Sequence, residues 1–187
     1  PENLKATLVF AIASFATSGI NYITTPIFTR ILSTSEYGLI SVYNSWFEIV
    51  RVFASVTLIF PGILNVGLYE HSDNRWQYLS SMLGMTACST VVISVFYGIF
   101  HQSVNEFFKL PVSTIILMLI TCFFQPATIF WTQKQRYEIK YKSTFCVSVG
   151  TAVMAQVVSV IAVLCLKNSN HNMGVVRLWS AGIVNLI

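Results

Sequence analysis

Long apolar runs are the feature that most limits what this chain can fold into. A bilayer crossing takes about 20 mostly apolar residues, and several stretches of the sequence meet that requirement. Only 10% of the 187 residues are charged and 55% are hydrophobic, whereas a soluble domain usually carries about 25% charged residues. The sequence therefore predicts an all-α membrane protein, a multi-pass helical bundle.

The predicted spans follow one another through short loops, which leaves no room for an inserted soluble catalytic domain. Five spans are complete and a sixth is incomplete: 4–28, 34–60, 78–100, 111–131, 143–166 and 173–187. The chain begins at Pro1 rather than Met and stops inside an apolar run. We therefore expect residues 1–187 to form the N-terminal transmembrane lobe of a longer protein.

Charge and cysteine content argue against two kinds of partner. The net charge is +4, but the 11 Lys and Arg residues are too few and too dispersed to follow a phosphate backbone, so we expect no nucleic-acid partner. The four cysteines lie inside apolar runs without CxxC spacing, and the three histidines are far apart in sequence. This pattern predicts no metal site and no cofactor.

Lys and Arg also indicate the orientation, because cytoplasmic loops of membrane proteins carry an excess of them. Four of these residues lie in the stretch from Lys134 to Lys142, with Tyr137 and Tyr141 between them. Placing this stretch in the cytoplasm gives six Lys and Arg residues there and four on the other side. We therefore expect a cell-membrane protein with a cytoplasmic amino terminus, whose basic stretch also contacts anionic lipid.

A capping box precedes the second predicted span. Ser33 is followed three residues later by Glu36, which is the spacing at which a serine caps a helix and a glutamate reaches back to it. Glu36 is therefore predicted to be structural.

Four predicted spans each carry a polar stripe at helical spacing. The stripes are Ser14, Thr17, Ser18, Asn21, Thr24 and Thr25 in the first span; Ser41, Asn44, Glu48, Arg51 and Ser55 in the second; Thr121, Gln125, Thr128 and Thr132 in the fourth; and Thr144, Ser148, Thr151 and Ser159 in the fifth. Because lipid-facing surfaces do not hold polar side chains cheaply, these faces are predicted to look at protein or water. For the fourth and fifth spans, plain contact between helices is an equal alternative.

Glu48 and Arg51 are the most demanding members of these stripes. A charged residue at mid-bilayer costs about 2.5 to 3.5 kcal/mol on insertion scales. The two residues are three apart and can pair on one helix, so a structural salt bridge stands as an alternative to the lining of a hydrated cavity.

The loop between the first two predicted spans carries a distinctive motif. Residues 26–38 read Pro-Ile-Phe-Thr-Arg-Ile-Leu-Ser-Thr-Ser-Glu-Tyr-Gly, and after the second span Gly67–Glu70, Asp73 and Tyr78–Ser81 follow. This loop resembles that of the polysaccharide-biosynthesis flippases of O-antigen type, in which a proline, a Thr-Arg pair, a Leu-Ser and a Glu-Tyr-Gly recur at this spacing. The later segment looks like the family's cytoplasmic connection into its third helix.

The resemblance implies membership of the multidrug, oligosaccharidyl-lipid and polysaccharide exporter superfamily, with two lobes around a central cavity. It implies a transporter rather than an enzyme, whose substrate is an oligosaccharide on a polyprenyl pyrophosphate carrier. The implied partners are this substrate, membrane lipids, a coupling cation (H⁺ or Na⁺) and a polysaccharide polymerase. The candidate cavity residues are Arg51 or Arg30 for pyrophosphate, Asn21 and Asn44 with the hydroxyls for the sugars, and Glu48 for Arg51 or a cation. Gln125 is a further candidate for the cavity lining.

Three other functions are weighed against this one. A cation-coupled multidrug exporter of the same superfamily often has an acidic residue in its first helix, and the first span here has none. A membrane-embedded glycan polymerase or acyltransferase needs convergent histidines or carboxylates and a larger loop. A membrane scaffold would leave the stripe of Glu48 and Arg51 without a use.

Overall fold

The computed structural model describes residues 2–138, 141–166 and 172–186. These residues form seven α-helices and no β-strand, which confirms the predicted all-α class. The helices are α1 (Glu2–Ile31), α2 (Thr34–Ala54), α3 (Pro61–Glu70), α4 (Arg75–Phe108), α5 (Val112–Tyr137), α6 (Tyr141–Leu166) and α7 (Met173–Leu186).

Among the described residues, four helices are long and apolar enough to cross a membrane. They are α4 and α5 over their full lengths, α1 from Thr7 to Ile31, and α6 from Thr144 to Leu166. The residues of α7 from Met173 to Val184 form a shorter apolar helix. These are the features of a helical membrane protein.

The second predicted span, 34–60, is not one helix. The helix α2 ends at Ala54, and α3 begins only at Pro61. The end of α2 is a Schellman motif, because the Val56 N–H donates to the Phe53 carbonyl and the Thr57 N–H to the Val52 carbonyl, each at 3.2 Å.

The residues after α2 adopt an unusual backbone. Val56 and Thr57 have φ angles of 49° and 61°, in the left-handed region that glycine usually occupies and that β-branched residues rarely enter. Sequence reasoning placed the break at Pro61 because proline and glycine are the usual break signals. The helix ends earlier, at Ala54, and two β-branched residues in strained conformations follow it.

The third predicted span, 78–100, is shorter than the helix it predicts, α4. The third predicted span ends at Phe100, where α4 has a kink (φ −107°, ψ 23°) but then continues as helix to Phe108. Lys109 ends α4 in the left-handed conformation, with its N–H donating to the Asn105 carbonyl at 2.9 Å. The predicted loop at 101–110 is therefore mostly helical.

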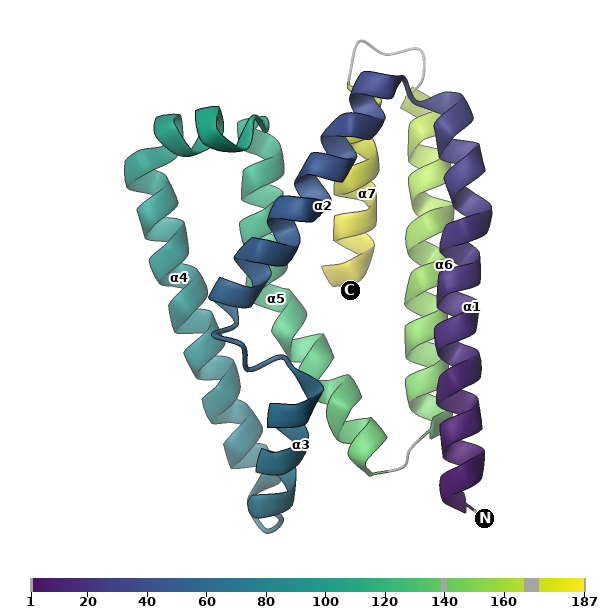
Figure 1. The fold of residues 1–187 in the computed structure, drawn as a ribbon, viewed down its shortest axis with the longest axis vertical. Coiled ribbons are helices and arrows are strands. Elements are labelled where there is room, and N and C mark those ends of the chain that lie inside the picture. Colours follow the sequence, from purple (N-terminus) through teal and green to yellow (C-terminus); the bar gives the residue numbers. More distant parts are fainter. Residues whose placement is uncertain (1, 139–140, 167–171, 187) are drawn as a thin grey trace. The chain divides into compact units, whose positions relative to one another are not determined.

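The chain divides into two compact units, Pro1–Ser41 with Glu138–Ile187, and Val42–Tyr137. In the first unit, α1 and α6 pack side by side and α7 packs on α6 (Figure 1). Buried hydroxyls of Ser159 and Ser180 join α6 to α7 at 3.2 Å, and the Arg177 guanidinium lies 3.7 Å from the centre of the fully buried Phe28 ring.

The second unit is built on the packing of α4 against α5, with α3 against both. Its core cluster comprises Ile59, Leu64, Leu68, Leu79, Met82 and Phe130. Leu64 and Leu68 are one turn apart on α3 and fully buried, so the short helix is held by one apolar face. The Ser89 hydroxyl donates to the Phe53 carbonyl at 3.2 Å, which ties α4 to the end of α2.

The predicted capping box is confirmed and has a second use. The Glu36 carboxylate accepts the Ser33 N–H at 2.9 Å and the Ser33 hydroxyl at 2.8 Å, while the Glu36 N–H donates to the Ser33 hydroxyl oxygen at 3.4 Å. The other Glu36 oxygen accepts the N–H of Met173, the first residue of α7, at 2.8 Å. A Cβ at Gly174 would lie 2.8 Å from the Glu36 carbonyl oxygen, so α7 begins in close contact with Glu36 in the first turn of α2.

Candidate functional site

The polar stripe of α1 is mostly satisfied within the helix itself. Four hydroxyls of the stripe donate to backbone carbonyls three or four residues earlier, namely those of Ser14, Thr17, Thr24 and Thr25. The Thr29 hydroxyl, outside the stripe, does the same. Thr121 of α5 and Thr151 of α6 do the same at 2.8 Å. Such back-bonding removes the need for an outside partner, so these hydroxyls do not by themselves mark a surface that faces water.

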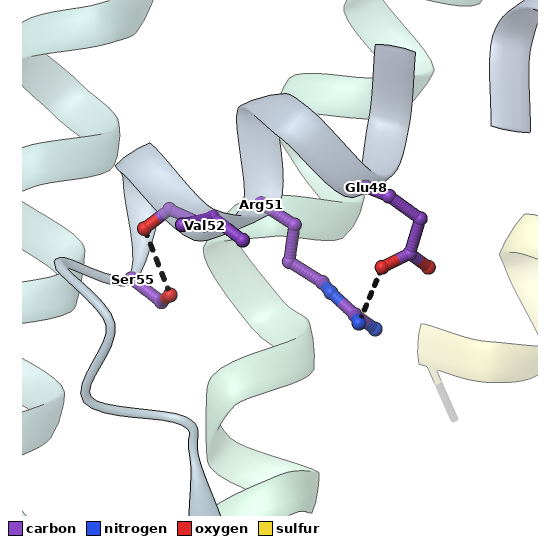
Figure 2. A network of polar contacts seen from close by, with 4 residues as sticks. All are labelled: Glu48, Arg51, Val52 and Ser55. Carbon is purple, nitrogen blue, oxygen red and sulfur yellow. Dashed lines mark hydrogen bonds and ion pairs between the residues drawn. The ribbon is translucent and has the colours of Figure 1, made fainter. Parts of the chain in front are cut away.

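The charged pair on α2 does require an explanation. Arg51 Nη2 donates to Glu48 Oε2 at 2.5 Å, and the side chains of Arg51 and Glu48 are 30% and 59% exposed. Figure 2 shows the two side chains reaching toward each other along the helix, with the Ser55 hydroxyl bonded to the Val52 carbonyl one turn further on. The pair is thus a partly exposed ion pair near the end of α2, as the sequence spacing allowed.

Arg51 retains unused hydrogen-bonding capacity. Its Nε is buried and has no hydrogen-bond partner in the described residues, and its guanidinium carbon lies 5.9 Å from the centre of the Phe47 ring. Because a guanidinium carries five N–H donors in a planar fork, one bond to Glu48 leaves a positively charged group able to receive an anion.

Gln125 on α5 has an unpartnered hydrogen-bond acceptor. Its Oε1 is buried and has no hydrogen-bond partner in the described part of the chain. One turn earlier on the same helix face lies the buried Cys122. Gln125 thus places an unpartnered buried acceptor on α5, in the same unit as the ion pair.

The structure places the six predicted site residues in two groups. Asn44 is exposed and lies one turn before Glu48 on α2, so Asn44, Glu48, Arg51 and Gln125 all belong to the unit Val42–Tyr137. Asn21 and Arg30 are exposed on α1 and belong to the other unit.

Sequence reasoning missed one polar residue, Gln156 on α6. Gln156 Nε2 donates to Asn21 Oδ1 at 2.8 Å, across 135 residues of sequence. The signal was present, because Gln156 is the one Asn or Gln residue in the otherwise strongly apolar stretch 144–166. The prediction instead relied on the stripe of hydroxylated residues that includes Thr151 and Ser159.

A cavity of about 550 Å³ lies among α2, α4 and α5 within the second unit. Its walls include Val50, Phe53, Phe96, Phe100 and Met118, and the lining is apolar. This cavity is unsuited to a glycan or a phosphate, because both need polar or charged partners.

The long apolar helices define a helical membrane protein, and both of its units carry polar side chains on these helices. A model of the family described as polysaccharide biosynthesis protein matches residues 27–170. The chain belongs to this family, whose match includes Arg30, Asn44, Glu48, Arg51 and Gln125. No curated protein and no solved structure matches the chain.

Proposed function

We propose that the protein is a flippase that moves a lipid-linked oligosaccharide from the cytoplasmic to the outer leaflet for assembly of a surface polysaccharide. The substrate is a glycan repeat unit on polyprenyl pyrophosphate, and transport proceeds by alternating access. The observation that carries the proposal is the partly exposed Arg51 with its unpartnered buried Nε, in a chain of the polysaccharide biosynthesis protein family. Arg51 binds the pyrophosphate, because guanidinium forks pair well with phosphate oxygens.

The break between α2 and α3 supports a transporter. Discontinuous membrane helices commonly lie beside substrate and ion sites in transporters. In this proposal α2 and α3 together make one membrane crossing. With one crossing each by α1, α4, α5 and α6, the chain has five crossings, and α7 begins a sixth. The chain is then the first lobe of a two-lobe transporter. Asn44 and Gln125 contribute to the substrate path, Arg30 is the alternative to Arg51 as the phosphate ligand, and Glu48 holds Arg51 or couples to H⁺ or Na⁺.

The function is tested in a strain whose own flippase gene is deleted. The full-length protein is expected to restore surface polysaccharide and to clear lipid-linked repeat units from the inner leaflet of the cell membrane. A vector without the gene is the control. A full-length protein that is present in the membrane but leaves the repeat units on the cytoplasmic side contradicts the proposal.

The proposed orientation places the amino terminus and the α3–α4 connection in the cytoplasm. In a full-length variant without native cysteines, an impermeant thiol reagent applied to intact cells is expected to label Ser103→Cys but not Ser72→Cys. Both residues are exposed, so both variants should react after the cells are opened. Labelling of position 72 alone in intact cells reverses the orientation.

A further inference from the structure

A pair of amides lies at the centre of two membrane spans. Asn21 is near the middle of the span Thr7–Ile31, and Gln156 is near the middle of Thr144–Leu166. Their hydrogen bond of 2.8 Å joins α1 to α6 at one depth, and the two helices lie side by side (Figure 1).

The pair keeps several hydrogen-bonding groups free. A primary amide offers two N–H donors and one carbonyl acceptor, and only Gln156 Nε2 and Asn21 Oδ1 are used by the bond between them. Within the described residues, neither side chain has another hydrogen bond. Asn21 is exposed and Gln156 is half-buried, so the Asn21 Nδ2 donors and the Gln156 Oε1 acceptor are accessible.

These free groups need a polar environment. An amide left without partners in hydrocarbon is strongly disfavoured, and the hydroxyls around Asn21 have avoided that penalty by bonding to their own helix. The amides have not done so. The surface that carries them therefore faces water, a polar ligand or polar protein groups rather than lipid.

The surroundings of the pair indicate a neutral ligand. The sequence has no Asp, Glu, Lys or Arg between Lys5 and Arg30, or between Lys142 and Lys167. A phosphate accepts hydrogen bonds only and favours a cationic partner, whereas a sugar hydroxyl both donates and accepts, as an amide does.

From this geometry we infer that Asn21 and Gln156 form a subsite for the hydroxyls of the glycan. The inference rests on the proposed flippase function and adds Gln156, on α6, to the residues that recognise the substrate. The Gln156 Oε1 atom accepts a hydrogen bond from a sugar hydroxyl, and the Asn21 Nδ2 group donates a hydrogen bond to a hydroxyl oxygen. The amide pair thereby binds the sugar and not the carrier lipid.

The test compares two lipids bound by the purified full-length protein: polyprenyl pyrophosphate bearing the repeat unit, and the same carrier without sugar. Gln156→Met and Asn21→Leu keep the side-chain size and remove the amide. Each is expected to raise the Kd for the glycan-bearing lipid about three- to tenfold, the usual range for one or two neutral hydrogen bonds. The Kd for the bare carrier should stay the same.

Ser14→Ala is the matched control, because the Ser14 hydroxyl on the same helix bonds to the Phe10 carbonyl, and it should change neither Kd. The exchange of Asn21→Gln with Gln156→Asn keeps both amides and should recover binding if a single variant folds poorly. Variants that bind both lipids as the wild type does, or that weaken both equally, overturn the subsite alone. A wild-type protein that binds neither lipid overturns the flippase function and the subsite with it.

Discussion

Arg51→Ala in the full-length protein is expected to abolish glycan export while the amount of protein in the membrane stays normal. The guanidinium is the proposed pyrophosphate ligand, and hydrogen bonds to charged groups contribute about 1.5 to 3 kcal/mol each, so binding should fall at least about tenfold. Arg51→Lys keeps the charge but loses the planar fork, and it should retain part of the activity. Export of lipid-linked glycan and protein level are measured together.

A purely structural ion pair gives a different result. If Arg51 only neutralises Glu48, each single neutral variant leaves an unpaired charge and lowers the protein level, whereas Glu48→Gln with Arg51→Gln restores both folding and transport. A fully active double variant would therefore remove Arg51 from the substrate site. Lys5→Ala is the matched control, because Lys5 is exposed near the start of α1.

The helices were accessible from sequence where one strong signal decided them. Long apolar runs predicted α1, α4, α5 and α6 to within a few residues at most ends, because about 20 consecutive apolar residues are typical of a membrane-spanning helix, which satisfies all its backbone hydrogen bonds internally. The capping box at Ser33 and Glu36 was equally readable, since it depends on contacts within one turn.

The end of α2 was not readable in the same way. Val56 and Thr57 favour extended or helical backbone on local preference. Their left-handed conformation is accompanied by hydrogen bonds to the Val52 and Phe53 carbonyls, and the residues that follow, Leu58 and Ile59, pack in the core cluster. A conformation that opposes local preference depends on tertiary contacts, and a single sequence does not display these.

The candidate site was predicted in part for a related reason. The pairing of Glu48 with Arg51 is local and follows from a spacing of three residues. The pairing of Asn21 with Gln156 joins residues 135 positions apart, so it required knowledge of which helices are neighbours. The hydroxyl stripe of α1 was a poor indicator of a surface that faces protein or water, because hydroxyls can bond to their own helix. Amides and charged groups are better indicators, because they need partners elsewhere.

Glu36→Ala is expected to destabilise the protein more than any other single removal of a carboxylate outside the site. One carboxylate accepts N–H groups at the start of two helices, from Ser33 before α2 and from Met173 at the start of α7. Loss of a helix cap costs about 0.5 to 2 kcal/mol, so two caps predict a loss of about 1 to 4 kcal/mol. This corresponds to a melting temperature lower by about 2 to 15 °C for a chain of this size.

Glu36→Gln separates charge from geometry. The amide keeps one acceptor oxygen but loses the negative charge that favours helix N-termini, so its melting temperature should fall between those of the wild type and Glu36→Ala. Glu70→Ala is the control, because Glu70 is exposed at the last residue of α3, where a carboxylate is not stabilised by the helix dipole. If Glu36→Ala melts at the same temperature as Glu70→Ala in detergent, the double cap contributes nothing to stability, and the start of α7 must be held by packing at Gly174 instead.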